Sequence, residues 1–182
     1  LKSIIRSGKL GDLQYIYSNR LNHGTIRSEE NVLWSFAPHD IALFQFLIGS
    51  FPLNVESRGI DLIQPNIRDT TITIFKYPNK VMSHIFVSWL HPFKEHRFIV
   101  IGSKGMIHFE DSIKDKKSLL FYDKNVKWDN DMPIAKSSSS IEIPFDKTSP
   151  LELELRYFIE HLNGKSLELC SGDSAVENMK IL

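Results

Sequence analysis

The chain has 182 residues, enough for one domain with its own apolar core and too few for two generous ones. Its 22 basic and 22 acidic residues cancel, so electrostatic binding to nucleic acid or to an anionic membrane is not expected. A hydrophobic fraction of 42%, with 12 Phe, 5 Tyr and 3 Trp, predicts a folded globular protein rather than a disordered one.

Cysteine usage and apolar runs exclude further classes. The single cysteine, Cys170, rules out an internal disulfide and a cysteine-rich metal site. The histidines show no metal-ligand spacing on a helix, so no metal is expected. No apolar run approaches the ~18–20 residues of a membrane span, and the first residues lack a signal-peptide pattern, which favours a cytoplasmic protein.

The first elements along the chain are a short helix over residues 1–8 and a strand over residues 12–22, followed by a polar loop over 23–31. Alternation in the strand places Arg20 and Asn22 on one face, at its polar end. That end is a candidate wall of a site, and a solvated sheet face is the alternative reading.

A histidine after this loop is the first candidate for chemistry. His39 follows Pro38 and precedes an apolar helix predicted over residues 40–48, which Gly49 ends. At a helix N-terminus the macrodipole is positive and disfavours imidazolium, so His39 is predicted to be a neutral base. A hydrogen-bonded structural histidine is the competing interpretation.

From Pro52 onward the apolar pattern changes to period two. Strands are predicted over residues 54–63, 70–77, 81–91, 97–101, 106–109, 119–122 and 141–145. Both faces of the 81–91 strand are expected to be largely covered, because apolar residues occur on each. Residues 102–105 predict a hairpin turn rather than a phosphate loop, because the Walker spacing is absent. Residues 123–140 are expected to form an exposed, mobile loop.

Two helices close the chain, one starting at Ser149 and ending at Gly164, the other over residues 174–182. The pattern as a whole predicts an α+β fold with an antiparallel meander of strands. Because the chain has no initiator methionine and opens inside a helix, a fragment of a longer protein is expected.

These segments together resemble the C-terminal domain of the Gfo/Idh/MocA oxidoreductases, most closely the branch acting on UDP-N-acetylglucosamine or its uronate as 3-dehydrogenases. The stretches that carry the resemblance are residues 18–22, 26–40, 88–95 and 100–106, with turns at 164–165 and 171–173. The general family pattern is Asp-x-Gly-x-His-x-x-Asp, from which this chain departs with Ser35, Ala37 and Ala42. Roles for Ser35 and for Asp40, which follows His39, are not implied.

The resemblance implies an open-faced, mostly antiparallel β-sheet with helices on one face. It also implies an N-terminal Rossmann domain that binds NAD(P), which is absent here because neither G-x-G-x-x-G nor Glu-Lys-Pro occurs in the sequence. Residues 1–182 are therefore expected to be one substrate-binding and oligomerisation domain, inactive on its own. The cofactor-binding residues cannot be named from this sequence and are expected mainly in the missing domain.

The implied reaction is oxidation of a secondary hydroxyl of a UDP-linked N-acetyl sugar or uronate, with hydride passing to NAD(P) and the proton to His39 or a lysine of the missing domain. A different sugar or polyol substrate is the alternative. Side chains that could bind the sugar nucleotide by hydrogen bonds or charge are Arg20, Asn22, Arg27, Asn31, His91 and Lys94. Surface or loop-bracing polarity is the competing interpretation for all six.

A second function of another class remains open. The domain could be a non-catalytic assembly module that forms a homo-oligomer through its exposed sheet face. Both roles are compatible, because a domain can dimerise without being active.

Overall fold

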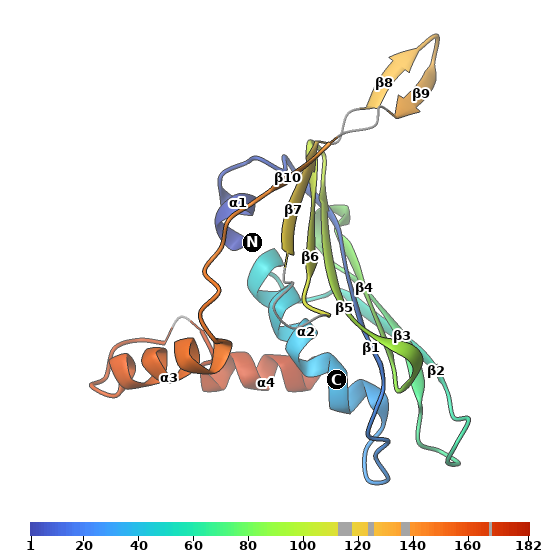
Figure 1. Cartoon of the computed structure of the whole chain (residues 1–182), viewed down its shortest axis with the longest axis vertical. Helices are drawn as coiled ribbons and strands as arrows, with labels where there is room; N and C mark the ends of the chain where they lie inside the picture. Colours follow the sequence, from blue (N-terminus) through green and yellow to red (C-terminus); the bar gives the residue numbers. More distant parts are fainter. Residues whose placement is uncertain (113–117, 124–125, 136–138, 168) are drawn as a thin grey trace.

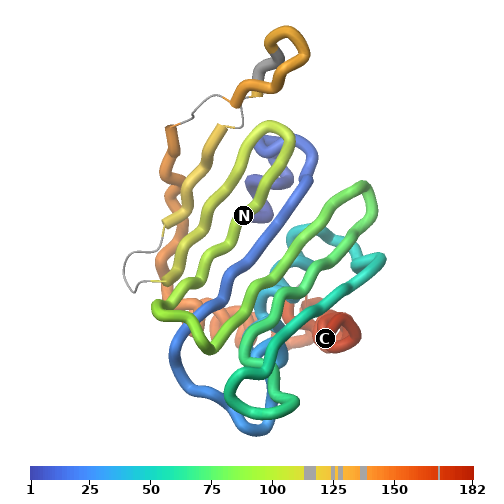
Figure 2. Tube along the Cα trace, turned by 90° about the vertical axis from the view of Figure 1, so that its right-hand side faces the viewer, coloured from blue at the N-terminus to red at the C-terminus, as the bar shows by residue number. Residues whose placement is uncertain are grey.

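A single large sheet forms the body of the molecule, and the helices lie on one side of it (Figure 1). The computed structural model describes residues 1–112, 118–123, 126–135, 139–167 and 169–182. Within these ranges eight strands form the sheet in the order β10-β7-β6-β5-β1-β4-β3-β2. Figure 2 views the same sheet face-on, with the helices behind it. The α+β class, the open, mostly antiparallel sheet and the one-sided helices are confirmed.

The elements have the following bounds. The strands of the large sheet are β1 (Leu13–His23), β2 (Asn54–Ile60), β3 (Thr70–Lys76), β4 (Met82–Ser88), β5 (Leu90–Gly102), β6 (Gly105–Glu110), β7 (Ser118–Asp123) and β10 (Ser140–Glu142). The helices are α1 (Lys2–Arg6), α2 (Val32–Ile48), α3 (Pro150–His161) and α4 (Gly172–Ile181), with a short 3₁₀ turn, η1 (Pro78–Lys80). Strands β8 (Val126–Asp129) and β9 (Met132–Ala135) form a separate hairpin.

Strand β1 lies at the centre and pairs with β4 in parallel and with β5 antiparallel. Leu21 of β1 pairs with Ser88 at the end of β4, and His23 pairs with Leu90 at the start of β5. The chain therefore passes the end of β1 and returns along its other side. As a result, the last residues of β1 and the first residues of β5 meet at one end of the sheet.

Helix α2 covers one face of the sheet and fills the core. The ring of Phe44 contacts the rings of Phe75 and Phe98, with centroids 5.8 and 5.6 Å apart, and both contacts join α2 to strands. Ile16, Phe44 and Phe75 have no exposed surface. Burying such side chains contributes ~1.5–3 kcal/mol each before chain entropy is counted, so α2 is held chiefly by this layer.

The opposite face of the sheet carries no second layer among the described residues. Met82 of β4 is 39% exposed and Ile72 of β3 is 48% exposed, whereas Ile85 and Val87, on the α2 side of β4, are fully buried. The expectation that both faces of the 81–91 segment are largely covered is therefore wrong for this chain. Apolar side chains on the face away from α2 do not by themselves supply a second layer that covers them.

The predicted helix start before Asp40 is also wrong. Helix α2 begins at Val32, and the side chain of Asn31 caps it by accepting a hydrogen bond from the Trp34 backbone N–H at 3.0 Å. Pro38 lies inside the helix rather than at its edge. The N-terminal cap and the buried stripe of α2 outweigh the local cost of one proline.

Other boundaries differ less. Strand β5 begins at Leu90, so the segment predicted to start at residue 97 is seven residues longer at its beginning. The predicted loop over 123–140 contains the β8–β9 hairpin, and its residues 124–125 and 136–138 lie outside the described ranges. The hairpin turn predicted at 102–105 is confirmed, since it joins β5 to β6. None of the described helices is long and apolar enough to cross a membrane.

Candidate functional site

An ion pair between β1 and α2 lies at the centre of the candidate site. The Arg20 Nε donates to Asp40 Oδ2 at 2.7 Å, and Arg20 Nη2 donates to Asp40 Oδ1 at 3.4 Å. The Ser18 hydroxyl donates to the same carboxylate at 2.7 Å. The Asp40 side chain is 5% exposed and that of Arg20 is 25% exposed. A carboxylate this deeply buried needs its charge compensated, and Arg20 and Ser18 together do so.

The imidazole of His96 lies beside Arg20 and Asp40. His96 of β5 is paired in register with Arg20 of β1. Burial lowers the pKa of His96, and the positive charges of Arg20 and Lys94 lower it further. The carboxylates of Asp111 and Asp40 act in the opposite direction without outweighing burial. His96 is therefore neutral at neutral pH and can accept a hydrogen bond or a proton.

These groups line a small hollow. Its volume is about 100 Å³, and Arg20, Asp40, His96 and Asp111 are among its lining residues. Guanidinium, imidazole and carboxylate groups so close together offer both donors and acceptors to a polyhydroxyl ligand. No group of three or more described side chains has the arrangement of a metal site.

His39 lies beside this cluster in the chain but does not have the environment that the sequence predicted. It is exposed and lies two turns inside α2, beyond the first turn over which the helix dipole acts. The electrostatic reason given for its reactivity is therefore wrong. What the structure provides instead is position, because the neighbouring Asp40 fixes this turn of α2 to β1. Its catalytic role stays a prediction.

Three of the predicted substrate-binding residues lie at the same end of the sheet as Arg20. Asn22 is half-buried near the end of β1, and His91 and Lys94 are in the first residues of β5. His91 makes a local contact, with Nδ1 2.9 Å from the Phe93 carbonyl oxygen. Lys94 is exposed and close enough to His96 to affect its titration. The pairing of β1 with β5 therefore places these residues at one end of the sheet.

Arg27 and Asn31 lie elsewhere, in the loop before α2. Arg27 is exposed and pairs with Glu30 at 3.8 Å, while its carbonyl accepts a hydrogen bond from Gln64. The side chain of Asn31 caps α2. Asn31 also lines a separate hollow of about 340 Å³ with Glu30 and Trp34. For these two residues, loop bracing is the observed contact and substrate binding is untested.

Sequence reasoning missed His96, Ser18 and Asp40. His96 was overlooked because the strand was predicted to start at residue 97, although Lys94 and His96 alternate as one face of an extended segment requires. Asp40 follows His39 directly, but its partner is 20 residues earlier on another element. No local pattern pairs Arg20 with Asp40.

Comparison with protein families identifies the domain. A family model described as GFO/IDH/MocA C-terminal domain matches residues 1–108, which include α2, strands β1 to β5 and most of β6. A comparison with curated proteins finds no match.

Solved structures share the fold at low identity. UDP-N-acetylglucosamine 3-dehydrogenase GnnA from Acidithiobacillus ferrooxidans superposes with a TM-score of 0.79 and 16% identity, over 98% of this chain and 55% of that chain. Aldose-aldose oxidoreductase from Caulobacter crescentus gives a TM-score of 0.74 and 13% identity, over 98% of this chain and 54% of that chain. Levoglucosan dehydrogenase in complex with NADH and L-sorbose gives 0.74 and 15%, over 99% and 57%.

The chain thus spans little more than half the length of the solved structures that it resembles. The similar solved structures support the fold alone. The family is shown by the sequence match, which covers more than half of the chain. By that match, this chain belongs to the GFO/IDH/MocA family and contains its C-terminal domain.

Proposed function

We propose that this domain is the substrate-binding and catalytic half of an NAD(P)-dependent dehydrogenase that acts on a sugar. The proposed substrate is a UDP-linked N-acetyl sugar or its uronate, oxidised at the C3 hydroxyl. The observation that carries the proposal is the polar cluster around Arg20 and Asp40, adjacent to His39 and inside the segment that matches the family. The likeness to GnnA supports the choice of substrate class.

The chain's own part in the reaction concerns the proton. Oxidation of a secondary alcohol removes a hydride and a proton, and the His39 imidazole would accept the proton of the hydroxyl. Arg20 has five N–H donors, of which two reach Asp40. It can therefore anchor α2 and still offer an N–H to an oxygen of the substrate. His96, Asn22 and Lys94 would bind further hydroxyl, carboxylate or pyrophosphate groups.

The glycine-containing turn of the described residues does not fit a dinucleotide. The glycine-containing turn at 102–105 joins two antiparallel strands, so no helix N-terminus follows it to receive a pyrophosphate. We therefore place NAD(P) binding outside these residues, in a nucleotide-binding domain of the full-length protein.

The test uses the full-length protein. NAD(P)H formation at 340 nm would be followed with UDP-N-acetylglucosamine, its uronate and levoglucosan. His39→Ala should lower kcat by ~10²-fold or more in whichever reaction is found. His23→Ala, which removes an exposed imidazole at the end of β1, is the matched control and should leave kcat unchanged.

Two results would count against the proposal. Near-normal turnover by His39→Ala would remove His39 from the mechanism. A full-length protein that neither binds NAD(P) nor reduces it with any of these sugars would contradict the enzyme class itself.

A second function, assembly, is favoured by the outer sheet face, which we define as the side of β1 to β6 that faces away from α2. Ile72, Ile74 and Met82 are exposed on it, and the register places Ile74 beside His84. Exposed apolar side chains on an uncovered sheet face are a feature of interaction surfaces, although Arg58, Glu56 and Lys76 pair beside them here. We propose that a second copy of the chain packs on it, which is compatible with catalysis.

Light scattering on the full-length protein checks this. Ile72→Lys should shift an oligomer toward smaller species, because a buried lysine opposes association. Leu62→Lys, at an exposed apolar residue in the loop before β3, is the control. A wild-type protein that is monomeric at micromolar concentration would contradict assembly through this face.

A further inference from the structure

A hollow of about 340 Å³ at the start of α2 is separate from the cluster around the ion pair. Its lining residues come from the loop before α2, from the first turn of that helix and from the loop before β3, and they are Glu29, Glu30, Asn31, Trp34, Asn66 and Ile67. Three kinds of polar or aromatic group therefore meet in it: an indole ring, two carboxylates and two side-chain amides.

The two loops that form this hollow are fastened to each other. The Val32 backbone N–H donates to the Arg68 carbonyl oxygen at 2.9 Å. The Gln64 side-chain amide donates to the Arg27 carbonyl oxygen at 3.0 Å. These hydrogen bonds join the segment before α2 to the segment before β3 on both sides of the hollow, so its walls are set in the absence of a ligand.

Asn66 is also held in place from within its own loop. Its backbone N–H donates to Asp61 Oδ2 at 2.8 Å, and Arg68 pairs with the same carboxylate. The φ angle of Asn66 is 66°, in the left-handed region that asparagine tolerates better than most residues. A ligand that binds the Asn66 amide would therefore lose little free energy to ordering of this loop.

Trp34 gives the hollow an open aromatic surface. Trp34 is 45% exposed, and no ring contact among the described residues involves it. Its backbone N–H donates to the capping side chain of Asn31, which fixes the first turn of α2 from which the indole projects. Covering an exposed indole with a flat apolar surface removes that area from water and is favourable.

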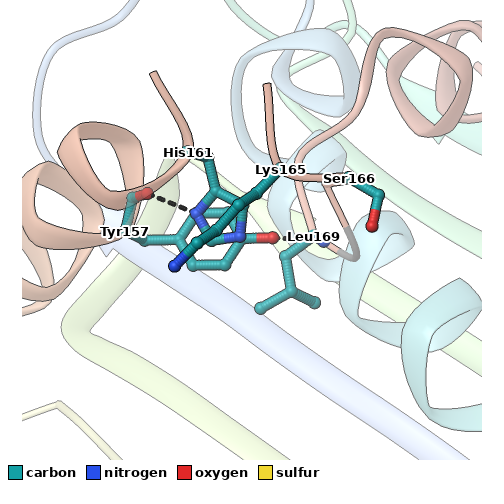
Figure 3. A pocket seen from close by; sticks show the side chains of 5 residues that line it. All are labelled: Tyr157, His161, Lys165, Ser166 and Leu169. Atoms are coloured by element: carbon teal, nitrogen blue, oxygen red, sulfur yellow. Dashed lines mark hydrogen bonds between the residues drawn. The ribbon is translucent and has the colours of Figure 1, made fainter. Parts of the chain in front are cut away.

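A larger hollow beside α3 lacks such a surface (Figure 3). Its volume is about 510 Å³, and Tyr157, His161 and Lys165 are among its lining residues. The rings of Tyr157 and His161 have centroids 4.0 Å apart, so they pack on each other. The His161 Nδ1 is also occupied, at 2.7 Å from the Tyr157 carbonyl oxygen. Of these two hollows, the one at the start of α2 is the one that combines an open ring with carboxylates.

The groups around Trp34 select the class of ligand. Glu29 and Glu30 offer carboxylate oxygens that accept hydrogen bonds from neighbouring hydroxyls, and the Asn66 amide can both donate and accept. None of the described lining residues is basic, so a phosphate or another anion would be repelled. A sugar ring has a face of C–H groups and a rim of hydroxyls, which matches an indole face bordered by carboxylates and amides.

A cation is the competing ligand, because an indole and carboxylates also attract positive charge. Glu30 is already paired with Arg27 at 3.8 Å, which offsets part of the negative charge of the hollow. Aromatic cages for organic cations surround the charge with several rings, whereas Trp34 is the one aromatic residue among the described lining residues. The hollow therefore suits a neutral ring better than a cation.

We propose that the hollow at the start of α2 binds a neutral sugar ring by stacking it on Trp34, while the neighbouring carboxylates and Asn66 bind its hydroxyls. This ring is distinct from the sugar that would react at His39. Trp34 and His39 are about 7.5 Å apart along the helix axis and about 140° apart around it. The site goes beyond the proposed function and does not depend on it.

Tryptophan fluorescence of the full-length protein tests the site, with N-acetylglucosamine, glucose and uridine as neutral probes. At least one of them should change the emission of the wild type in a saturable way, with half-saturation on the order of millimolar because few atoms are in contact. Trp34→Phe removes the reporting indole, so the change should disappear. The double variant Glu29→Gln, Glu30→Gln keeps the indole and should raise the half-saturating concentration about threefold or more. Phe51→Ala, at an exposed ring beyond the other end of α2, is the matched control and should leave it unchanged.

Wild-type emission that responds to none of the three probes would overturn the site, and this reading needs no folded variant. A change that persists in Trp34→Phe would also overturn it, because the sugar would then be sensed elsewhere. Choline and inorganic phosphate are the charged comparisons, and a stronger response to either would replace the neutral ring by a cation or an anion. NAD(P)H formation is measured in parallel: activity without an emission change removes only this site, whereas an emission change without activity removes only the proposed function.

Discussion

Arg20 Nε lies 2.7 Å from Asp40 Oδ2, and this ion pair fastens the central strand to helix α2 one residue away from His39. The carboxylate is nearly inaccessible to water, while the guanidinium is partly solvated. The Ser18 hydroxyl of β1 donates a third hydrogen bond to the Asp40 carboxylate. The orientation of this turn of α2, and with it the position of His39, depends on a polar contact inside an otherwise apolar layer.

The ion pair should be strongly coupled. Asp40→Ala and Arg20→Met are each expected to lower the free energy of unfolding by about 2–4 kcal/mol, the lower part of that range reflecting the solvation of Arg20. Arg20→Met should lower the free energy of unfolding more than Asp40→Ala, because it leaves a buried carboxylate without a cation.

Urea unfolding of both single variants and the double variant should give a coupling energy of about 1–3 kcal/mol. Additive single effects would contradict the assignment. As a control, the exposed pair of Glu152 and Arg156 should couple by ~0.5 kcal/mol or less.

The cap of α2 gives a test that separates structure from substrate binding. Asn31→Ala should lower the free energy of unfolding by about 1 kcal/mol, because the Trp34 N–H loses its acceptor. Asn31→Asp keeps that acceptor and should retain stability while removing the amide N–H₂ donor. A raised KM in Asn31→Asp with unchanged stability would show that Asn31 also contacts substrate; an unchanged KM would leave capping as its role.

Stability should fall as pH is lowered through the range in which histidine titrates. His84 stacks on Tyr17 with ring centroids 5.0 Å apart, its Nδ1 lies 2.5 Å from the Tyr15 hydroxyl, and burial lowers its pKa. Below the unfolded pKa of about 6.5, the unfolded state binds more protons than the folded state, so the folded state loses stability until pH falls below the lowered folded pKa. Chemical unfolding between pH 7.5 and 5 should show this decrease. His84→Phe keeps the stack and should reduce the slope, and an identical slope in the variant would exclude His84 as a source. The pKa of His96 is also lowered by burial, so His96 should contribute part of the pH dependence that remains in His84→Phe.

The end of β5 has no room for a side chain at Gly102. A Cβ there would lie 2.2 Å from the Leu10 carbonyl oxygen, which is backbone and cannot rotate away. Gly102→Ala should therefore cost about 1–3 kcal/mol by overpacking, read from thermal or urea unfolding. Gly172→Ala at the start of α4 meets no atom within 4 Å and should be neutral or slightly stabilising. Equal stability of the two variants would show that the β5 end can move.

Local patterns predicted much of the sheet. Strands β3, β6 and β7 begin and end within two residues of their predicted bounds, and so does the start of β4. The segment predicted over 81–91 contains β4 and the first residues of β5. The agreement is good because period-two alternation and Pro or Gly at strand ends are local features of the sequence. The same local reasoning failed at α2, where Pro38 was interpreted as a helix boundary. A cap at Asn31 and burial of Phe44 against two strands outweigh that proline, and burial is not a local property.

The sequence by itself determined the class of domain, the alternation of its strands and the family resemblance of the stretch around His39. Only the tertiary structure decided that Arg20 meets Asp40, that His96 joins them, and that the helix dipole does not act on His39. It also decided which apolar faces stay uncovered, on the outer sheet face and along α3. The physical reason is that these contacts depend on strand order and on the crossing at the end of β1, where residues distant in the chain become neighbours.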